Sequence, residues 1–363
     1  MSTGLQEGLR NALARYVEPN LGLALGDAGA IESVEAGAGV PVARIVLGFP
    51  VEGYRDTLIG ALRAHLAAAG VTGEVAFEIS ARIPAFVADP RQHPLPEVGN
   101  VIAVASGKGG VGKSTVAANL ALALAAAGAR TGLLDADIYG PSQPMMLGIS
   151  GKPESIDGQT LEPMENYGLQ VSSIGLLIDA DQPMVWRGPM VTQALQQLLG
   201  QTNWKDVDYL VVDMPPGTGD IQLTLAQQVP VTGAVIVTTP QDIALIDARK
   251  GLKMFEKVSI PILGIVENMA VHVCSKCGHT EHIFGAEGGK KMAEQYGVDY
   301  LGSLPLDIRI REQADAGRPT VVADPDSPIT AAYKAIARKV AIRIAEKAKD
   351  MSLKMPTIKV SNT

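Results

Sequence analysis

The sequence has little of what marks secreted, membrane-spanning or nucleic-acid-binding proteins. It contains only two cysteines among 363 residues, which excludes a framework of disulfide bonds. No apolar run reaches the roughly 18 residues of a membrane-spanning helix, and the first residues, MSTGLQEGLR, lack the segments of a secretory signal. The net charge of −7 gives no general support for nucleic-acid binding. We therefore expect a cytoplasmic protein that binds neither membranes nor nucleic acids.

Aromatic residues are also scarce, at 4%, although hydrophobic residues make up 47% of the chain. Alanine, valine, leucine and glycine dominate, and such small side chains favour the close packing of helices on a sheet in an α/β protein. The length of the chain suits about two domains.

The order of apolar segments predicts a small domain followed by a large one. Residues 1–88 are expected to form an α+β domain with the order α-β-β-α-β, and residues 89–99, which contain prolines, a linker. From residue 100 to 350, apolar strands alternate with helices, which predicts a doubly wound, mostly parallel sheet with its ligand site at the carboxyl ends of the strands. Residues 351–363 are expected to be a flexible tail. The expected strands of the large domain are residues 100–106, 131–135, 169–174, 207–213, 233–239, 261–268 and 300–303.

The stretch 101–115, VIAVASGKGGVGKST, is the strongest signal in the chain. It follows the pattern G-x-x-x-x-G-K-[ST] between an apolar strand and an alanine-rich helix, which is typical of a phosphate-binding loop. Glycines let backbone N–H groups surround phosphate oxygens, and the start of the helix adds further donors. Lys113 is expected to reach the β- and γ-phosphates of ATP, and the Ser114 hydroxyl to ligate Mg²⁺. The expected nucleotide-binding residues here are Gly107, Lys108, Gly109, Gly110, Val111, Gly112, Lys113, Ser114 and Thr115.

Polar residues follow three other expected strands, and these also point to nucleotide chemistry. Asp135 and Asp137 come after the second strand, where we expect Asp135 to hold the magnesium shell and Asp137 to orient or deprotonate the attacking water. Asp213 ends an apolar strand, as a Walker B aspartate does, and is expected to accept from a magnesium-bound water. Asn268 ends another strand and is expected to contact the adenine edge.

The phosphate-binding loop carries a second lysine, Lys108, directly after its first glycine. In this respect the loop resembles the deviant Walker A family of P-loop ATPases. The resemblance implies a face-to-face dimer in which Lys108 reaches the nucleotide of the partner chain. Trp186 and Arg187, just before a predicted helix, are candidates for the same interface.

Both cysteines lie in one C-x-x-C, formed by Cys274 and Cys277 after the strand that ends at Asn268. Two thiolates at this spacing can hold a soft metal ion or one edge of a cluster, but they are too few for a site with four cysteines. A dimer would supply four. The spacing is compatible with an iron–sulfur cluster that bridges two chains, with zinc held by four thiolates or with the help of His279 and His282, and with a redox dithiol. Spacing alone does not separate zinc from a cluster, because both accept sulfur ligands.

Several motifs occur together and in order over about residues 100–320: SGKGGVGKST, LLDADIYGPS, WRGPM, VDMPPGTGD, HIFG and LGSLPLDIRIRE. With the C-x-x-C, they resemble the iron–sulfur cluster carrier ATPases of the Mrp/ApbC type. The small domain resembles one that is often fused ahead of such ATPases, although the cysteine that some versions carry is missing here.

The resemblance implies a homodimeric, cytoplasmic ATP hydrolase that binds a 4Fe–4S cluster across the dimer. It also implies delivery of the cluster to apo iron–sulfur proteins and contact with cluster scaffold proteins. By motif, Lys108, Lys113, Asp137 and Asp213 would be catalytic, while Cys274 and Cys277 would hold the cluster. A spatial-organising ATPase of the MinD/ParA type and a zinc-bridged P-loop dimer are the alternatives.

Overall fold

A computed structural model describes residues 2–36, 39–86, 95–177, 188–219, 222–224, 226 and 229–354 of the chain. Trp186, Arg187, most of the expected linker and residues 355–363 of the expected tail lie outside these ranges. The chain divides into two compact units. The first comprises Met1–Pro84, Ala126–Gly128 and Ala341–Thr363, and the second comprises Ala85–Ala125 and Ala129–Val340.

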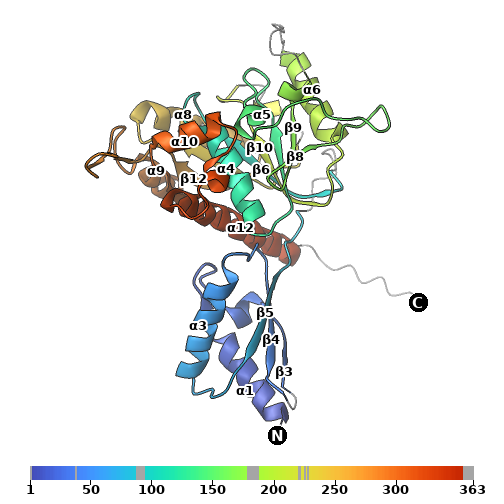
Figure 1. The fold of residues 1–363 in the computed structure, drawn as a ribbon, viewed down its shortest axis with the longest axis vertical. Helices are drawn as coiled ribbons and strands as arrows, with labels where there is room; N and C mark the ends of the chain where they lie inside the picture. Colours follow the sequence, from blue (N-terminus) through green and yellow to red (C-terminus); the bar gives the residue numbers. More distant parts are fainter. Residues whose placement is uncertain are drawn as a thin grey trace. The chain divides into compact units, whose positions relative to one another are not determined.

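The second unit is built on an eight-stranded sheet with the order β15-β12-β11-β6-β10-β7-β9-β8 (Figure 1). All neighbours are parallel except β8 and β9, so the predicted doubly wound, mostly parallel α/β fold is confirmed. The strands are β6 (Val98–Ala105), β7 (Thr131–Asp135), β8 (Met164–Asn166), β9 (Leu169–Ser173), β10 (Val207–Asp213), β11 (Gly233–Thr238), β12 (Ile262–Glu267) and β15 (Tyr300–Ser303).

Seven of these strands match the apolar segments expected from the sequence, with ends that differ by at most two residues. The strand expected over 169–174 ends at Ser173, because Ile174 begins a short 3₁₀ helix, η1 (Ile174–Leu176). The eighth strand, β8, was not expected. It has three residues and none of them is fully buried, so it lacks the apolar signature of the other strands.

Helices cover the sheet and bury its apolar side chains. Helix α4 (Lys113–Ala126) follows the phosphate-binding loop and is buried over most of its length, as expected for a helix that consists almost entirely of alanine, valine and leucine after Thr115. The other helices in the described part of this unit are α5 (Gln143–Met146), α6 (Gly188–Gln201), α8 (Asp242–Lys257), α9 (Gly288–Tyr296), α10 (Ile308–Asp315), α11 (Thr320–Ala323) and α12 (Pro328–Lys354), of which the residues up to Val340 belong to this unit. A large core joins the strand side chains to α6 and α8, with Leu210, Ile236 and Phe255 among its fully buried members.

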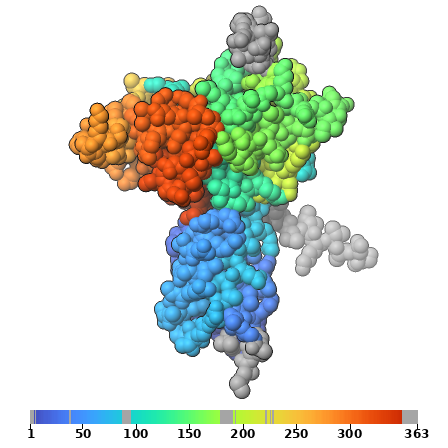
Figure 2. Space-filling view, viewed as in Figure 1, coloured from blue at the N-terminus to red at the C-terminus, as the bar shows by residue number. Residues whose placement is uncertain are grey.

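Segments that are distant in the sequence pack together in this unit. The Tyr167 hydroxyl, after β8, donates to the carbonyl of Gly317 at 3.0 Å, and Figure 2 shows the red surface around α10 beside the green surface of the middle of the chain. The apolar stripe of α12, including Tyr333, Ile336 and Val340, is buried. Among the residues that the structure describes, every helix is too short or too polar to span a bilayer.

The first unit has a three-stranded sheet with the order β3-β4-β5, in which β3 and β4 are antiparallel and β4 and β5 are parallel. Alternate residues of β4 are buried, including Ile45 and Leu47, and leucines of the two longer helices share this core. The elements are α1 (Ser2–Ala14), β1 (Val17–Glu18), β2 (Leu23–Ala24), α2 (Leu25–Ala28), β3 (Ile31–Glu35), β4 (Val42–Leu47), α3 (Arg55–Ala68) and β5 (Ala76–Ala81). The expected order α-β-β-α-β is present, and the hairpin β1–β2 and α2 add to it.

Candidate nucleotide site and cysteine hairpin

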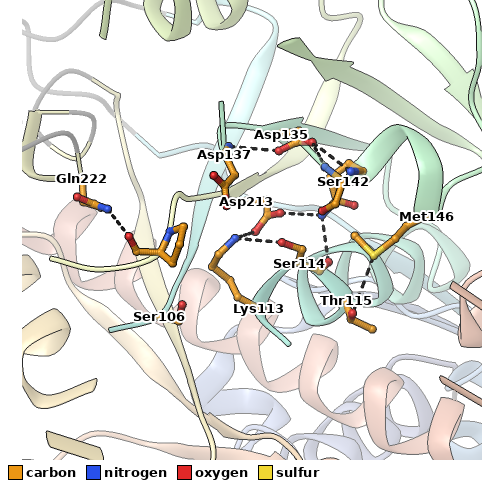
Figure 3. Close-up of polar contacts among 12 residues, drawn as sticks. Ser106, Lys113, Ser114, Thr115, Asp135, Asp137, Ser142, Met146, Asp213 and Gln222 are labelled. Atoms are coloured by element: carbon orange, nitrogen blue, oxygen red, sulfur yellow. Dashed lines mark hydrogen bonds and ion pairs between the residues drawn. The ribbon is translucent and has the colours of Figure 1, made fainter. Parts of the chain in front are cut away.

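The sheet order brings the predicted nucleotide residues together at the carboxyl ends of three neighbouring strands. Strand β10 lies between β6 and β7, and Asp213 at its end is in register with Val104 on β6 and with Asp135 on β7. The glycine-rich loop follows β6. Because parallel strands end at the same edge of the sheet, the loop and both carboxylates meet there (Figure 3).

The conformation of the glycine-rich loop depends on residues without a side chain. Gly110 and Gly112 both have φ of +81°, which favours glycine. Gly107 lies so close to α8 that a Cβ atom there would be 2.1 Å from the carbonyl carbon of Asp247. The loop is also tied to the segment after β10, since the Gly217 N–H donates to the Ser106 carbonyl at 2.9 Å.

Lys113 is the first residue of α4, and its side chain is 5% exposed. Its ammonium group forms an ion pair with the fully buried Asp213 and lies 3.1 Å from the Ser114 hydroxyl oxygen. Figure 3 shows these three side chains converging between the loop and the strand ends. The structure therefore joins the predicted Walker A lysine, the predicted magnesium ligand and the Walker B aspartate in one cluster.

Asp135 is fully buried, and its carboxylate organises the loop that follows β7. It accepts hydrogen bonds from the N–H groups of Asp137 at 3.2 Å, Ser142 at 3.0 Å and Gln143 at 3.1 Å, and from the Ser173 hydroxyl at 3.1 Å. Burial and the nearby charge of Asp213 raise the pKa of Asp135 to about 7, although these hydrogen bonds oppose the shift.

Asp137 is half-buried beside the same cluster (Figure 3). Burial raises its pKa, and the charge of Asp213 adds to this effect, while the charge of Lys113 opposes it. A carboxylate with a raised pKa near the phosphate-binding loop suits the role of general base. Lys108, by contrast, is exposed, and its backbone carbonyl accepts from the Ser106 hydroxyl at 2.9 Å.

Asn268 lies against the phosphate-binding loop. Its Nδ2 donates to the Val111 carbonyl at 2.9 Å, and its backbone N–H donates to the Thr238 carbonyl at 2.7 Å. The amide therefore supports the loop, a role that the sequence did not suggest. Its expected contact with adenine stays a prediction.

Gln143 is a site residue that the sequence analysis missed. It begins α5, and its Nε2 donates to Asp213 Oδ2 at 2.8 Å and to the Ser114 carbonyl at 3.0 Å. It directly follows the motif LLDADIYGPS, which ends at Ser142, and no pattern there distinguished it from an ordinary loop glutamine. Only the long-range contact identifies it.

The two cysteines lie at the tip of a small hairpin. Strand β13 (His272–Val273) pairs with β14 (Thr280–Glu281), and the turn is closed by the Gly278 N–H, which donates to the Cys274 carbonyl at 2.8 Å. Cys274 is half-buried and Cys277 is exposed. Backbone N–H groups of Lys276 and Cys277 and the Cys277 thiol lower the pKa of the Cys274 thiol, which favours the thiolate that binds metals.

The three nearby histidines have other partners. His272 Nδ1 donates to the Leu306 carbonyl at 3.0 Å, His282 Nδ1 donates to the Ala270 carbonyl at 2.8 Å, and His279 Nε2 lies 3.6 Å from Glu281 Oε1. Across the described ranges, no group of three or more His, Cys, Asp or Glu side chains is placed to hold a metal ion.

A glycine-rich loop between a buried parallel strand and a helix, with its lysine beside a Walker B aspartate, defines a P-loop NTPase. Sequence comparison is more specific, because the family described as ParA, NUBPL iron-transfer P-loop NTPase, matches residues 97–341. The chain belongs to this family.

Known relatives agree with this assignment. An iron-sulfur cluster carrier protein of Pseudomonas fragi is 65% identical over 245 residues, which cover 67% of this chain and 85% of that protein. An iron-sulfur cluster carrier protein of Synechocystis is 44% identical over 333 residues, which cover 90% of this chain and 94% of that protein. The solved structure of a nucleotide-binding protein from Archaeoglobus fulgidus, in complex with ADP, is 38% identical, with a TM-score of 0.56, and the match covers 65% of this chain and 92% of that one.

Proposed function

We propose that this protein is a cytoplasmic, ATP-hydrolysing iron–sulfur cluster carrier. In this proposal a homodimer binds one 4Fe–4S cluster through Cys274 and Cys277 of both chains and delivers it to apo iron–sulfur proteins. The names of the relatives support the carrier function. The observation that carries the proposal is the pair of thiols, one exposed and one half-buried, on a hairpin of a P-loop NTPase.

The hairpin suits a cluster that is held and then released. Cys274 already receives backbone N–H donors, so its thiolate is stabilised before any metal binds. The exposed Cys277 leaves the site open to a second chain and to a recipient protein. Each chain contributes two thiols, whereas a 4Fe–4S cluster takes four cysteine ligands, so two chains complete one site.

The nucleotide site suits MgATP. The Lys113 ammonium lies between the Ser114 hydroxyl and the Asp213 carboxylate, so a cation is accommodated between two oxygens of the kind that magnesium prefers. Ser114 would ligate the ion and Asp213 would hold one of its waters. When bound, magnesium neutralises charge on the β- and γ-phosphates.

The hydrolysis step is assigned to residues of both chains. Asp137 orients the attacking water and takes its proton, while Lys113 and the partner's Lys108 stabilise charge that develops on the γ-phosphate. We propose further that the nucleotide state changes the dimer geometry and with it the grip on the cluster. The small domain over residues 1–88 is proposed to dock recipient or scaffold proteins.

Anaerobic reconstitution with iron and sulfide tests the cluster assignment. We expect one 4Fe–4S cluster per two chains by iron and sulfide analysis, with a brown, oxygen-labile absorbance. Cys277→Ser should abolish the cluster but spare ADP binding, while Ser275→Ala, in the same turn, should keep both. A chain that takes up only zinc, or a Cys277→Ser variant that retains full iron content, would overturn the proposal.

A further inference from the structure

Gln143 connects the three segments that form the nucleotide site. Its backbone N–H donates to Asp135, and its side-chain Nε2 donates both to Asp213 Oδ2 at 2.8 Å and to the Ser114 carbonyl at 3.0 Å. The residue is 0% exposed. The side chain of Gln143 therefore contacts Ser114 at the start of α4 and the Walker B aspartate. Its backbone N–H binds Asp135 at the end of β7.

The orientation of this amide follows from its neighbours. Both partners of Nε2 are oxygen acceptors, so the opposite orientation would place the amide oxygen against a carboxylate and a carbonyl. In the observed orientation Oε1 is buried, with no hydrogen-bond partner among the described residues. A buried orphan acceptor is costly, and an apolar side chain of equal length would avoid this cost. The amide is therefore poorly explained by packing alone.

Lys113 cannot keep its ion pair with Asp213 and bind the phosphates of a nucleotide at the same time. In a P-loop the lysine reaches the β- and γ-phosphates, and an ammonium that moves to the phosphates no longer neutralises the aspartate. Asp213 Oδ1 then loses its partner inside a buried site that also contains Asp135 and Asp137. Gln143 Nε2 donates to the other carboxylate oxygen, Asp213 Oδ2. This hydrogen bond can remain when Lys113 moves to the phosphates.

We infer that Gln143 is a positioning residue that holds the Asp213 carboxylate in place for the magnesium ion when Lys113 turns to the phosphates. This inference rests on the proposed nucleotide site and deepens it. Gln143 itself need not touch the nucleotide, because it acts through Asp213. The loss of its amide should therefore weaken the contribution of magnesium to nucleotide binding more than it weakens binding of the nucleotide itself.

Calorimetric titration of the full chain with ADP, with and without Mg²⁺, separates these effects. For Gln143→Met we expect the affinity for ADP without Mg²⁺ to stay within about twofold of wild type, because the phosphate-binding loop is intact. The gain in affinity on adding Mg²⁺ should fall about tenfold, as for the loss of a hydrogen bond to a charged group. A gain equal to that of wild type would overturn the inference. An equal loss with and without Mg²⁺ would also overturn it, since Gln143 would then only support the loop through Ser114.

A matched control is Gln170→Met on β9. Gln170 Nε2 donates to the Lys205 carbonyl at 2.8 Å and its Oε1 accepts from the Lys205 N–H at 2.9 Å, so this variant also loses two hydrogen bonds of a glutamine. It should keep the full Mg²⁺ gain. If Gln143→Met does not fold, as judged by thermal unfolding, Gln143→Asn retains the amide but is too short to span both acceptors, and its Mg²⁺ gain should also fall. An unchanged gain in that variant would overturn the inference. A wild-type protein that binds no ADP would instead overturn the proposed function, and this inference with it.

Discussion

Lys113, the buried lysine of the candidate nucleotide site, interacts with two carboxylates. Lys113 forms an ion pair with Asp213, and its charge also opposes the rise in the pKa of Asp137. Removing one member of a buried pair leaves the other charge uncompensated, which costs far more than the pair itself contributes. The lysine is therefore important for stability as well as for binding phosphate, and variants must separate the two roles.

We predict that Lys113→Met lowers the free energy of unfolding by about 3 kcal/mol or more, because Asp213 stays buried with one donor fewer. The double variant Lys113→Met/Asp213→Asn should recover a large part of this loss, since the neutral amide still accepts from Gln143. Neither variant should bind MgADP. Urea unfolding and calorimetry measure the two effects. A double variant as unstable as the single one would show that the charge of Asp213 is not the cause.

The raised pKa of Asp135 predicts how stability depends on pH. Between about pH 4 and 7, Asp135 is protonated in the folded chain. In the unfolded chain, where its pKa is 3.8, it is already ionised. The free energy of unfolding should therefore fall as the pH rises through this window, by up to ~1.4 kcal/mol per pH unit. In Asp135→Asn, which does not titrate, this part of the slope should disappear, whatever the absolute stability.

Unfolding in urea at several pH values measures this slope. Asp157→Asn is the control, because hydrogen bonds from Thr160 and Gln159 lower the pKa of this exposed carboxylate, so its titration lies below the window. An Asp135→Asn variant with the same slope as wild type between pH 4 and 7 would contradict the assignment.

Single residues show what a sequence pattern can and cannot identify. Lys113, Ser114 and Asp213 were expected because their spacing is set by one strand, one loop and one helix. Gln143 was missed because its function depends on contacts with Asp213, 70 residues away, and with Ser114. Asn268 was expected at the site, but its hydrogen bond to Val111 joins the segments that follow β12 and β6, two strands that lie on either side of β11.

At the scale of elements, the backbone of the glycine-rich loop packs directly against the backbone of α8 at Gly107. Helix α8 carries Asp247 directly against Gly107, where no Cβ atom fits. Gly109, two residues further on, has nothing within 4 Å of the position of a Cβ atom. The loop is therefore packed at its first glycine and open at its second.

We predict that Gly107→Ala lowers the free energy of unfolding by about 2 kcal/mol or more, because backbone atoms have to move apart. Gly109→Ala should change it by about 0.5 kcal/mol or less, as at an open surface position. Thermal or urea unfolding without nucleotide gives both values, so phosphate binding does not enter the comparison. Equal effects of the two substitutions would mean that α8 does not restrain the loop.

The strands of the large sheet were predictable because parallel strands are buried on both faces and appear as continuous apolar runs. The short strands β8, β13 and β14 were not predictable, because a strand of two or three residues is too short to show an alternation of apolar and polar side chains. The sequence placed the C-x-x-C only after the strand that ends at Asn268, whereas in the structure it lies on a hairpin whose pairing and turn arrange the donors around Cys274.

At the scale of the whole molecule, burial separates the proposed roles. Lys113 and Asp213, proposed to act within one chain, are buried, while Lys108 and Cys277, proposed to act across two chains, are exposed. A symmetric dimer would place each exposed group against the partner chain. The sequence indicates a dimer only indirectly. Lys108 is a second lysine beyond the general phosphate-binding pattern, and the C-x-x-C supplies only two of the four cysteines that a cluster takes.

Mixing two inactive variants tests whether Lys108 acts in the partner's site. Lys108→Ala and Lys113→Ala should each lose ATP hydrolysis as homodimers. In a mixed dimer, the chain with Lys108→Ala keeps its own Lys113 and receives the intact Lys108 of the other chain, so one of the two sites is complete. Random mixing in equal amounts should therefore restore about a quarter of wild-type activity. Mixing Lys113→Ala with Asp213→Ala is the control and should restore no activity. Each site needs Lys113 and Asp213 from the same chain, so every site in a mixed dimer lacks one of the two. If Lys108 acted in its own chain, the first mixture would stay inactive too.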